Sequence, residues 1–132
     1  MALKLSLKPG EKFVINGAVV QNGDRRIDLV ILNKVSILRN KDIMQLDEAD
    51  TPVKRIYFAV MMMYMDKKSE KQFYQEFVER ISEFMKAIKN EKALAECVSI
   101  IENVQAKRYY KALGSCKKLI PFEKQRLEYV SA

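Results

Sequence analysis

The stretch FVINGAVVQNGD, residues 13–24, decides the fold class of the first part of the chain. Two Asn-Gly pairs, Asn16-Gly17 and Asn22-Gly23, stand there among short apolar runs. Asparagine and glycine both tolerate the positive φ angles of a type I′ turn, which joins neighbouring antiparallel strands. We therefore predict a hairpin of residues 13–15 and 18–20 around the first pair, and another turn at the second.

Further short strands are predicted on both sides of this stretch. Leu3, Leu5 and Leu7 alternate with polar residues, and this period of two is typical of a half-buried strand. Apolar runs at residues 27–32 and 35–39 follow the second turn. This pattern predicts an antiparallel meander of about five short strands, followed by a polar connector.

After residue 50 the apolar spacing becomes helical. Thr51-Pro52 is typical of an N-cap and a first helical residue, and helix is preferred over a buried strand for the apolar segment that follows. The clearest periodicity follows Ser69–Gln72, which has the pattern of a capping box. Two more apolar stripes predict further helices, with Asn90 between two of them and Pro121 ending the last stripe.

The predicted fold class is therefore α+β. A small N-terminal antiparallel β-module, residues 1–50, is a candidate RNA-binding domain. A C-terminal bundle of three to four helices, residues 51–132, is a candidate dimer or partner surface. A chain of 132 residues is long enough for one domain or for two small modules that share a core.

Residue types needed for catalysis are scarce. The chain has no histidine, no glycine-rich phosphate loop, and acidic residues that mostly fall on predicted helix faces or in the connector. Its two cysteines, Cys97 and Cys116, are too few for a four-ligand zinc site and are interpreted as buried, reduced thiols. We expect no enzyme activity, no cofactor and no bound metal.

The apolar runs are too short for a membrane protein. The longest, residues 56–65, has ten residues, whereas crossing a bilayer takes about twenty. The alternating N-terminus does not resemble a signal peptide. We therefore expect a cytoplasmic protein that does not contact a membrane.

Basic residues exceed acidic ones by 24 to 17, a net charge of +7 that is shared between the two halves. In the β-module these cations suit a polyanion such as RNA, because lysine and arginine neutralise phosphates and arginine can also bind guanine. The alternative is that they are solvated lysines that prevent edge strands from aggregating. The candidate RNA-binding cations are Lys4, Lys8, Arg25, Arg26, Arg39 and Lys41.

The helical half contains a second candidate surface. Met61, Met62 and Met63 are consecutive, so on a helix they cannot all face the same way. They predict either an adaptable groove for a partner or ordinary core packing. With Tyr109 and Tyr110 they form the candidate partner-binding set.

Four stretches resemble the FlbT flagellin translation repressors of alphaproteobacteria. They are LKLSLKPGEKFVINGAVV (3–20), ILRNKDIM (37–44), RIYFAVMMMY (55–64) and RYYKAL (108–113). The resemblance implies a cytoplasmic post-transcriptional regulator. Such a protein binds the 5′ untranslated region of flagellin mRNA, represses or destabilises the message, and acts alongside a small partner called FlaF.

The β-module alone also resembles, more faintly, the carbon storage regulator family. That family dimerises by strand exchange and binds GGA-containing leaders through its first strand and an arginine on its last. Ser6 and Lys8 match the first-strand positions and Arg39 matches the arginine. This resemblance adds Ser6 to the candidate RNA-binding residues.

The leading hypothesis is therefore binding of the flagellin mRNA leader, without catalysis. The alternative is a flagellin-binding adaptor or chaperone that grips flagellin or a FlaF-like protein through its helical half. A homo-oligomer is a further prediction, because an edge strand such as Leu3–Leu7 can pair with a copy of itself.

Overall fold

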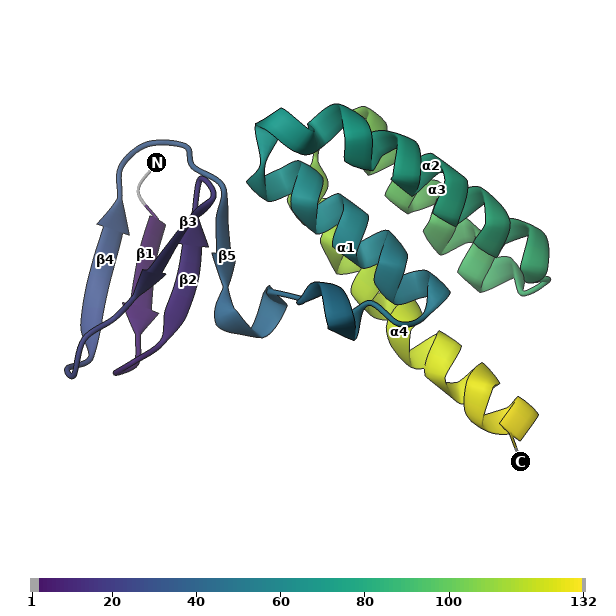
Figure 1. Cartoon of the computed structure of the whole chain (residues 1–132), viewed down its shortest axis with the longest axis horizontal. Helices are drawn as coiled ribbons and strands as arrows, with labels where there is room; N and C mark the ends of the chain where they lie inside the picture. Colours follow the sequence, from purple (N-terminus) through teal and green to yellow (C-terminus); the bar gives the residue numbers. More distant parts are fainter. Residues whose placement is uncertain (1–2, 132) are drawn as a thin grey trace. The chain divides into compact units, whose positions relative to one another are not determined.

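The computed structural model describes the backbone of residues 3–131 and the side chains of residues 3–126. The chain divides into two compact units, of which the first ends at Ile43 and the second begins at Met44 (Figure 1). Antiparallel strands make up the first unit and four α-helices dominate the second, which confirms the α+β class. We call them the β unit and the helical unit.

The bounds of the strands follow the predicted runs closely. The β unit contains β1 (Leu3–Leu7), β2 (Lys12–Ile15), β3 (Ala18–Gln21), β4 (Ile27–Ile31), β5 (Ile37–Arg39) and the short 3-10 helix η1 (Asn40–Asp42). The helical unit contains η2 (Leu46–Glu48), α1 (Pro52–Met65), η3 (Lys67–Ser69), α2 (Glu70–Ala87), α3 (Glu91–Gln105) and α4 (Tyr109–Ser131).

The strands form two small sheets instead of the predicted meander. One sheet pairs β1 with β4, and the other has the order β3-β2-β5. The meander was wrong because the chain changes sheets three times, between β1 and β2, between β3 and β4, and between β4 and β5. Neither Asn22 nor Gly23 has the positive φ of a type I′ turn within the described residues, so this segment does not close a hairpin.

The hairpin at the first Asn-Gly pair is confirmed. Asn16 and Gly17 have φ angles of 49° and 86°, and Ile15 pairs with Ala18 across the turn. Glycine adopts this left-handed region without steric cost, and asparagine is among the few other residues that tolerate it.

The β unit has a small core. Leu7, Phe13, Val14 and Leu38 are all buried, so both sheets contribute to it. Leu3, at the other end of β1, is 50% exposed. Burial of the leucines therefore increases along β1 toward Leu7, and the alternating leucines predicted to form one buried face are not all buried.

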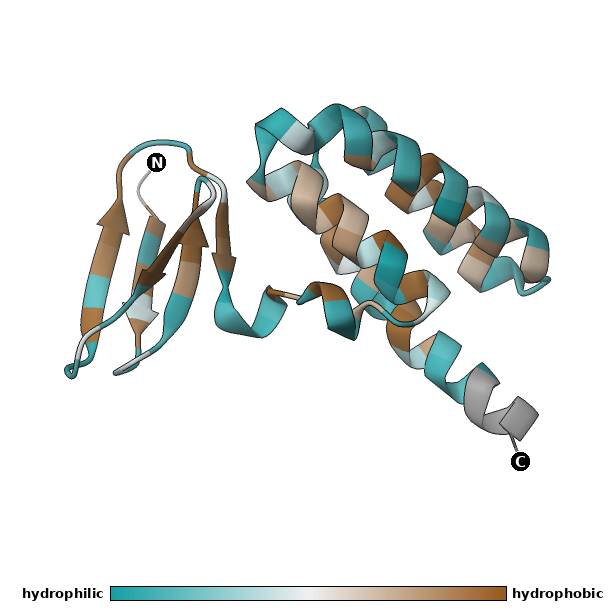
Figure 2. Ribbon diagram, viewed as in Figure 1, coloured by the Kyte–Doolittle hydropathy of each residue, from teal (hydrophilic) through white to brown (hydrophobic). Residues whose placement is uncertain are grey.

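Helix α1 is confirmed and lies at the centre of the helical unit, where it packs against α2 and α4. Lys54 N donates to the Thr51 Oγ1 cap, and Pro52 occupies the first turn, as predicted. Figure 2 shows α1 coloured as largely hydrophobic and α2 as mostly hydrophilic. A helix that is apolar on most sides must be covered by neighbours, which explains its position.

The capping pattern at Ser69 does not form in the structure. Its hydroxyl donates to the carboxylate of Asp66, which also accepts from Lys68 N at the start of η3. The Ser69 side chain is therefore bonded to Asp66 at the start of the 3-10 helix η3 and does not cap α2. Asn90 does cap a helix: its Oδ1 accepts from Ala93 N at the start of α3.

Helix α4 continues through Pro121, which was predicted to end it. An interior proline costs a helix about 3 kcal/mol, so other contacts must compensate. The buried carboxylate of Glu123 accepts hydrogen bonds from the Thr51 hydroxyl and from Val53 N at 2.9 Å. This anchors α4 at the positive end of the α1 dipole and favours continued helix beyond the proline.

Cys97 on α3 and Cys116 on α4 are buried free thiols, as predicted. Burial is the main reason that the pKa of Cys97 is raised to about 11. Burial likewise raises the pKa of Cys116. Across residues 3–131, no helix has the length and apolar character needed to span a membrane.

Candidate nucleic-acid interface

Three predicted RNA-binding residues lie on or directly after β1. Lys4, Ser6 and Lys8 are two residues apart, so the side chains of Lys4 and Ser6 share one face of the strand. Lys4 Nζ lies 3.7 Å from Asp28 Oδ2 on β4, and both side chains are largely exposed. An exposed ion pair of this kind contributes little to stability, so Lys4 is readily available to another anion.

A buried asparagine connects Lys8 to the predicted arginine pair. Asn22 Nδ2 donates to the carbonyl oxygen of Lys8 at 2.8 Å and to that of Arg25 at 2.9 Å, with a longer hydrogen bond to Leu7 O. Gly10 N donates to Gly23 O and joins the same two loops. These bonds hold the backbone of Lys8 close to that of Arg25, while both side chains remain exposed.

A second connection is made by Arg39 and Glu11. The Nε and Nη2 atoms of Arg39 donate to the Glu11 carboxylate at 2.8–3.1 Å, and Nη2 also donates to Ser6 O at 2.7 Å. Glu11 accepts a further bond from Lys8 N at 2.9 Å. The bond from Lys8 N, followed by the one from Arg39, lowers the pKa of Glu11.

Basic residues gather at one end of the β unit, where these hydrogen bonds connect Lys8, Arg25 and Arg39. At this end β1, β3 and β5 finish while β2 and β4 begin (Figure 1). We call this set the basic end, and it comprises Lys8, Lys12, Arg25, Arg26, Arg39 and Lys41. All but Arg39 are exposed. Three acidic residues, Glu11, Asp24 and Asp42, lie in the same segments, and Asp42 is buried.

The remaining predicted residues lie apart from the basic end. Lys4 is four residues before Lys8, roughly 13 Å away along an extended chain. The carbonyl oxygen of Ser6 accepts a hydrogen bond from Arg39, and this bond connects Ser6 to the basic end. The predicted basic sheet face is thus mainly a cluster at strand ends, and the guanidinium of Arg39 is engaged within the protein.

The chemistry of the basic end suits phosphate groups better than stacked bases. Five exposed, flexible cations can neutralise successive phosphates. Base stacking needs aromatic side chains, and Phe13, the sole aromatic residue before Tyr57, is buried. The arrangement can therefore hold an anionic backbone, and its route to sequence recognition is hydrogen bonding of lysine and arginine to base edges instead of stacking.

Sequence reasoning missed Asn22 and Glu11, the two residues that organise the site. Asn22 was interpreted as a turn residue because it precedes glycine. Glu11 gave a weak signal as an isolated acid between Lys8 and Lys12. Only the folded arrangement shows that each binds groups far away in sequence.

The predicted partner-binding residues do not form one surface. Met61 and Met63 are 2% and 1% exposed and lie in the core, because α1 is covered by other helices. Met62 is partly exposed. The Tyr109 hydroxyl donates to Glu70, whereas Tyr110 is 56% exposed and its ring lies 5.8 Å from that of Tyr64.

The fold and the site define a small two-unit α+β protein with an organised cationic surface. In its described part, no group of three or more His, Cys, Asp or Glu side chains could hold a metal ion. Residues 3–127 match the family model described as flagellar protein FlbT. The chain belongs to this family, which confirms the resemblance seen in the sequence.

Close relatives cover nearly all of both chains. A probable flagellum biosynthesis repressor protein FlbT from Caulobacter sp. (strain K31) is 60% identical over 99% of this chain and 100% of the relative. The flagellum biosynthesis repressor protein FlbT of Caulobacter vibrioides (strain ATCC 19089) is 57% identical, covering 100% and 94%. A relative in Rhodopseudomonas palustris (strain TIE-1) is 36% identical, covering 96% and 98%.

These relatives support a regulator of flagellum biosynthesis. No solved structure matches the chain.

Proposed function

We propose that this FlbT-family chain regulates flagellum biosynthesis by binding the 5′ leader of flagellin mRNA at the basic end. The observation that carries the proposal is the hydrogen bonding of Asn22, which holds Lys8 next to Arg25 with both side chains exposed. Because the loops are already connected, little ordering entropy is lost when an anionic strand binds.

Regulation then follows from occupancy and needs no catalysis. Lysine and arginine side chains of the basic end replace the counterions of successive phosphates, and their release favours binding. A leader covered in this way is closed to ribosomes, or is held in a form that nucleases attack. Arg39 acts in this scheme as a positioning residue, since its guanidinium holds Glu11 and Ser6.

The test is a titration of labelled flagellin leader RNA with the full-length protein at several salt concentrations. The double variant Arg25→Gln/Arg26→Gln should weaken binding and reduce the salt slope by about one for each phosphate that is no longer neutralised. Lys34→Gln is the matched control, because Lys34 is exposed but lies between β4 and β5, at the opposite end of the β unit.

Two results would contradict the proposal. Equal affinity of the double variant and the wild type would remove the basic end from the interface. Equal affinity for the leader and for a shuffled RNA of the same length would leave only non-specific polyanion binding.

A second candidate function is an adaptor or chaperone that binds flagellin through the helical unit. It is favoured by the exposed ring of Tyr110 and by a pocket beside Tyr109. Titration of flagellin in parallel with the RNA tests it, and a FlaF-like protein is the next partner to test. Self-association is tested by sedimentation of the free protein.

A further inference from the structure

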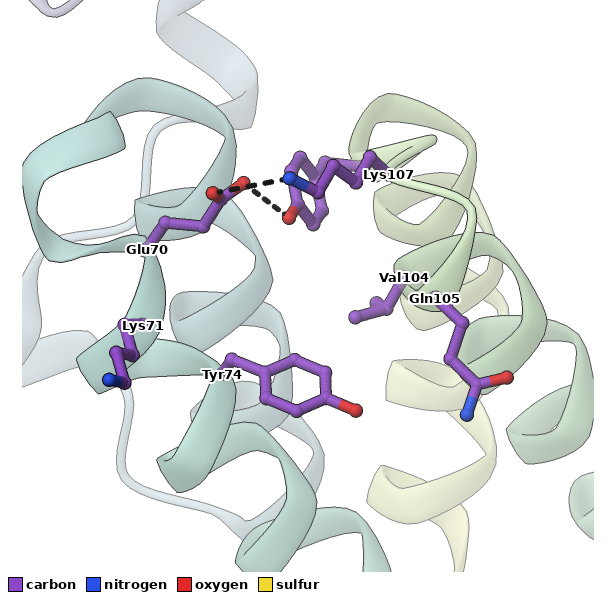
Figure 3. A pocket seen from close by; sticks show the side chains of 7 residues that line it. Glu70, Lys71, Tyr74, Val104, Gln105 and Lys107 are labelled. Atoms are coloured by element: carbon purple, nitrogen blue, oxygen red, sulfur yellow. Dashed lines mark hydrogen bonds and ion pairs between the residues drawn. The ribbon is translucent and has the colours of Figure 1, made fainter.

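One end of the helical unit is hollowed between three helices. A cavity of about 300 Å³ lies between the start of α2, the end of α3 and the start of α4 (Figure 3). Tyr74, Val104 and Tyr109 provide apolar wall, Lys107 brings a cation to it, and Lys71 lies at its edge (Figure 3). The size is at the lower end for ligand sites and suits a single large side chain better than a whole small molecule.

The acidic group in this pocket is already satisfied by the protein. Glu70 accepts a hydrogen bond from the Tyr109 hydroxyl at 2.5 Å, and Lys107 Nζ lies 3.8 Å from its other oxygen (Figure 3). Glu70 therefore holds the pocket wall together. Its charge is offset, which leaves Lys71 as an exposed cation on the α2 side.

Lys107 occupies a backbone position that favours glycine. Its φ is 59°, and the Lys107 N to Val104 O and Arg108 N to Asn103 O bonds form the Schellman motif that ends α3. Glycine is the usual residue here, because a side chain is strained in the left-handed region. A lysine at this site costs backbone stability and places an ammonium group at the pocket.

Further cations belong to the segments at this end of the helical unit. Figure 1 shows the end of α1, the start of α2, the end of α3 and the start of α4 at the same end of the helical unit. The exposed basic residues of these segments, and of η3 between α1 and α2, are Lys67, Lys68, Lys71, Lys107, Arg108 and Lys111. Within the described residues, Lys107 is the one member of this set with an ion pair. The nearby Asp66 already accepts from Lys68 N and Ser69.

We propose that this pocket binds an acidic segment of a partner protein. One aromatic or large aliphatic side chain would enter beside Tyr74 and Val104, and flanking carboxylates would pair with Lys71 and Lys107. Charge complementarity identifies the acidic flanks, and the apolar wall identifies the anchor residue. The proposal does not depend on RNA binding, and it specifies the partner chemistry for the second candidate function.

The test uses the full-length protein and a fluorescent short peptide with one phenylalanine flanked by aspartates. Two matched peptides replace the aspartates by asparagine or the phenylalanine by alanine. We expect the parent peptide to bind and each replacement to weaken binding, because both features are recognised.

Lys107→Gly is the decisive variant. Glycine relieves the left-handed strain, so the variant should unfold at the same or a higher temperature than the wild type. Its affinity for the parent peptide should nevertheless fall, by about 1.5-fold to fivefold, the range expected for one exposed ion pair. Lys71→Gln should act similarly, and Lys92→Gln, on the first turn of α3, is the control.

Several outcomes would overturn the proposal. The first is that the parent peptide does not bind, and the second is that Lys107→Gly binds it as tightly as the wild type. The third is equal binding of the parent and asparagine peptides. The fourth is that single-stranded oligouridylate displaces the peptide and that this displacement requires Lys107. The last would assign the pocket to nucleic acid. Leader binding by Lys107→Gly is measured separately, so failure here is distinguishable from failure of the RNA proposal.

Discussion

The guanidinium of Arg39 and the carboxylate of Glu11 form a bidentate pair that joins β5 to the loop before β2. The same guanidinium reaches the carbonyl oxygen of Ser6 on β1. Arg39 thus links the two small sheets of the β unit. A residue that resembles a base-reading arginine is engaged in holding its own fold together.

This pairing predicts the behaviour of a Glu11→Gln variant. If Arg39 positions the loops, loss of the carboxylate should loosen them and weaken leader binding. If Arg39 instead reads a guanine, Glu11→Gln should free it and tighten binding, and Arg39→Ala should cost about 1–3 kcal/mol. Titration of both variants with leader RNA distinguishes these two roles of Arg39, and we expect Glu11→Gln to weaken RNA binding.

Asn22→Ala should lower RNA affinity without removing a charge. The buried amide of Asn22 donates to the carbonyl oxygens of Lys8 and Arg25, and losing these partly buried hydrogen bonds should lower the free energy of unfolding by about 1 kcal/mol. The loops should then separate. Chemical denaturation and leader titration check both effects, with the exposed Asn33→Ala as control; unchanged affinity in a destabilised variant would contradict the organising role.

The lowered pKa of Glu11 predicts an acid-dependent contribution to stability. A carboxyl whose pKa is lower in the folded state stabilises the fold fully above its unfolded pKa of about 4.3. This contribution is lost as the pH falls through the lower folded value. The stability gap between wild type and Glu11→Gln, from urea unfolding, should therefore shrink below about pH 4. A gap that widens on acidification would exclude this origin.

Glu123→Ala should destabilise the helical unit. It removes the acceptor for Val53 N and for the Thr51 hydroxyl at the start of α1, and loss of a charged hydrogen-bonding partner costs about 1–3 kcal/mol. The neighbouring exposed Lys124→Ala is the control. Thermal unfolding followed by circular dichroism measures the difference, and equal midpoints would show that Glu123 does not support α4 beyond Pro121.

The two cysteines should react slowly in the folded protein. Burial raises the pKa of Cys97 to about 11, and that of Cys116 is also raised, so few thiolates exist at pH 8. A disulfide-exchange reagent such as DTNB should modify both quickly only in denaturant. Rapid modification of the native protein would mean that α3 and α4 separate readily.

Local sequence signals determined the secondary structure well. The Asn16-Gly17 hairpin depends on two residues that accept positive φ, and the Thr51-Pro52 start depends on a hydroxyl and a ring at adjacent positions. The periods of two and of about 3.6 residues similarly reflect geometry within one element. The α+β class follows from these short-range properties alone.

Strand order and the form of the basic surface depended on the tertiary structure. Pairing of β1 with β4, the bonds from Asn22 to Lys8 and Arg25, and support of α4 by Glu123 all join segments far apart in the chain. Such interactions leave no periodic pattern, because each depends on burial and on a partner that arrives only on folding. The sequence alone therefore identifies the basic residues, whereas the hydrogen bonds of the folded chain determine which of them lie close together.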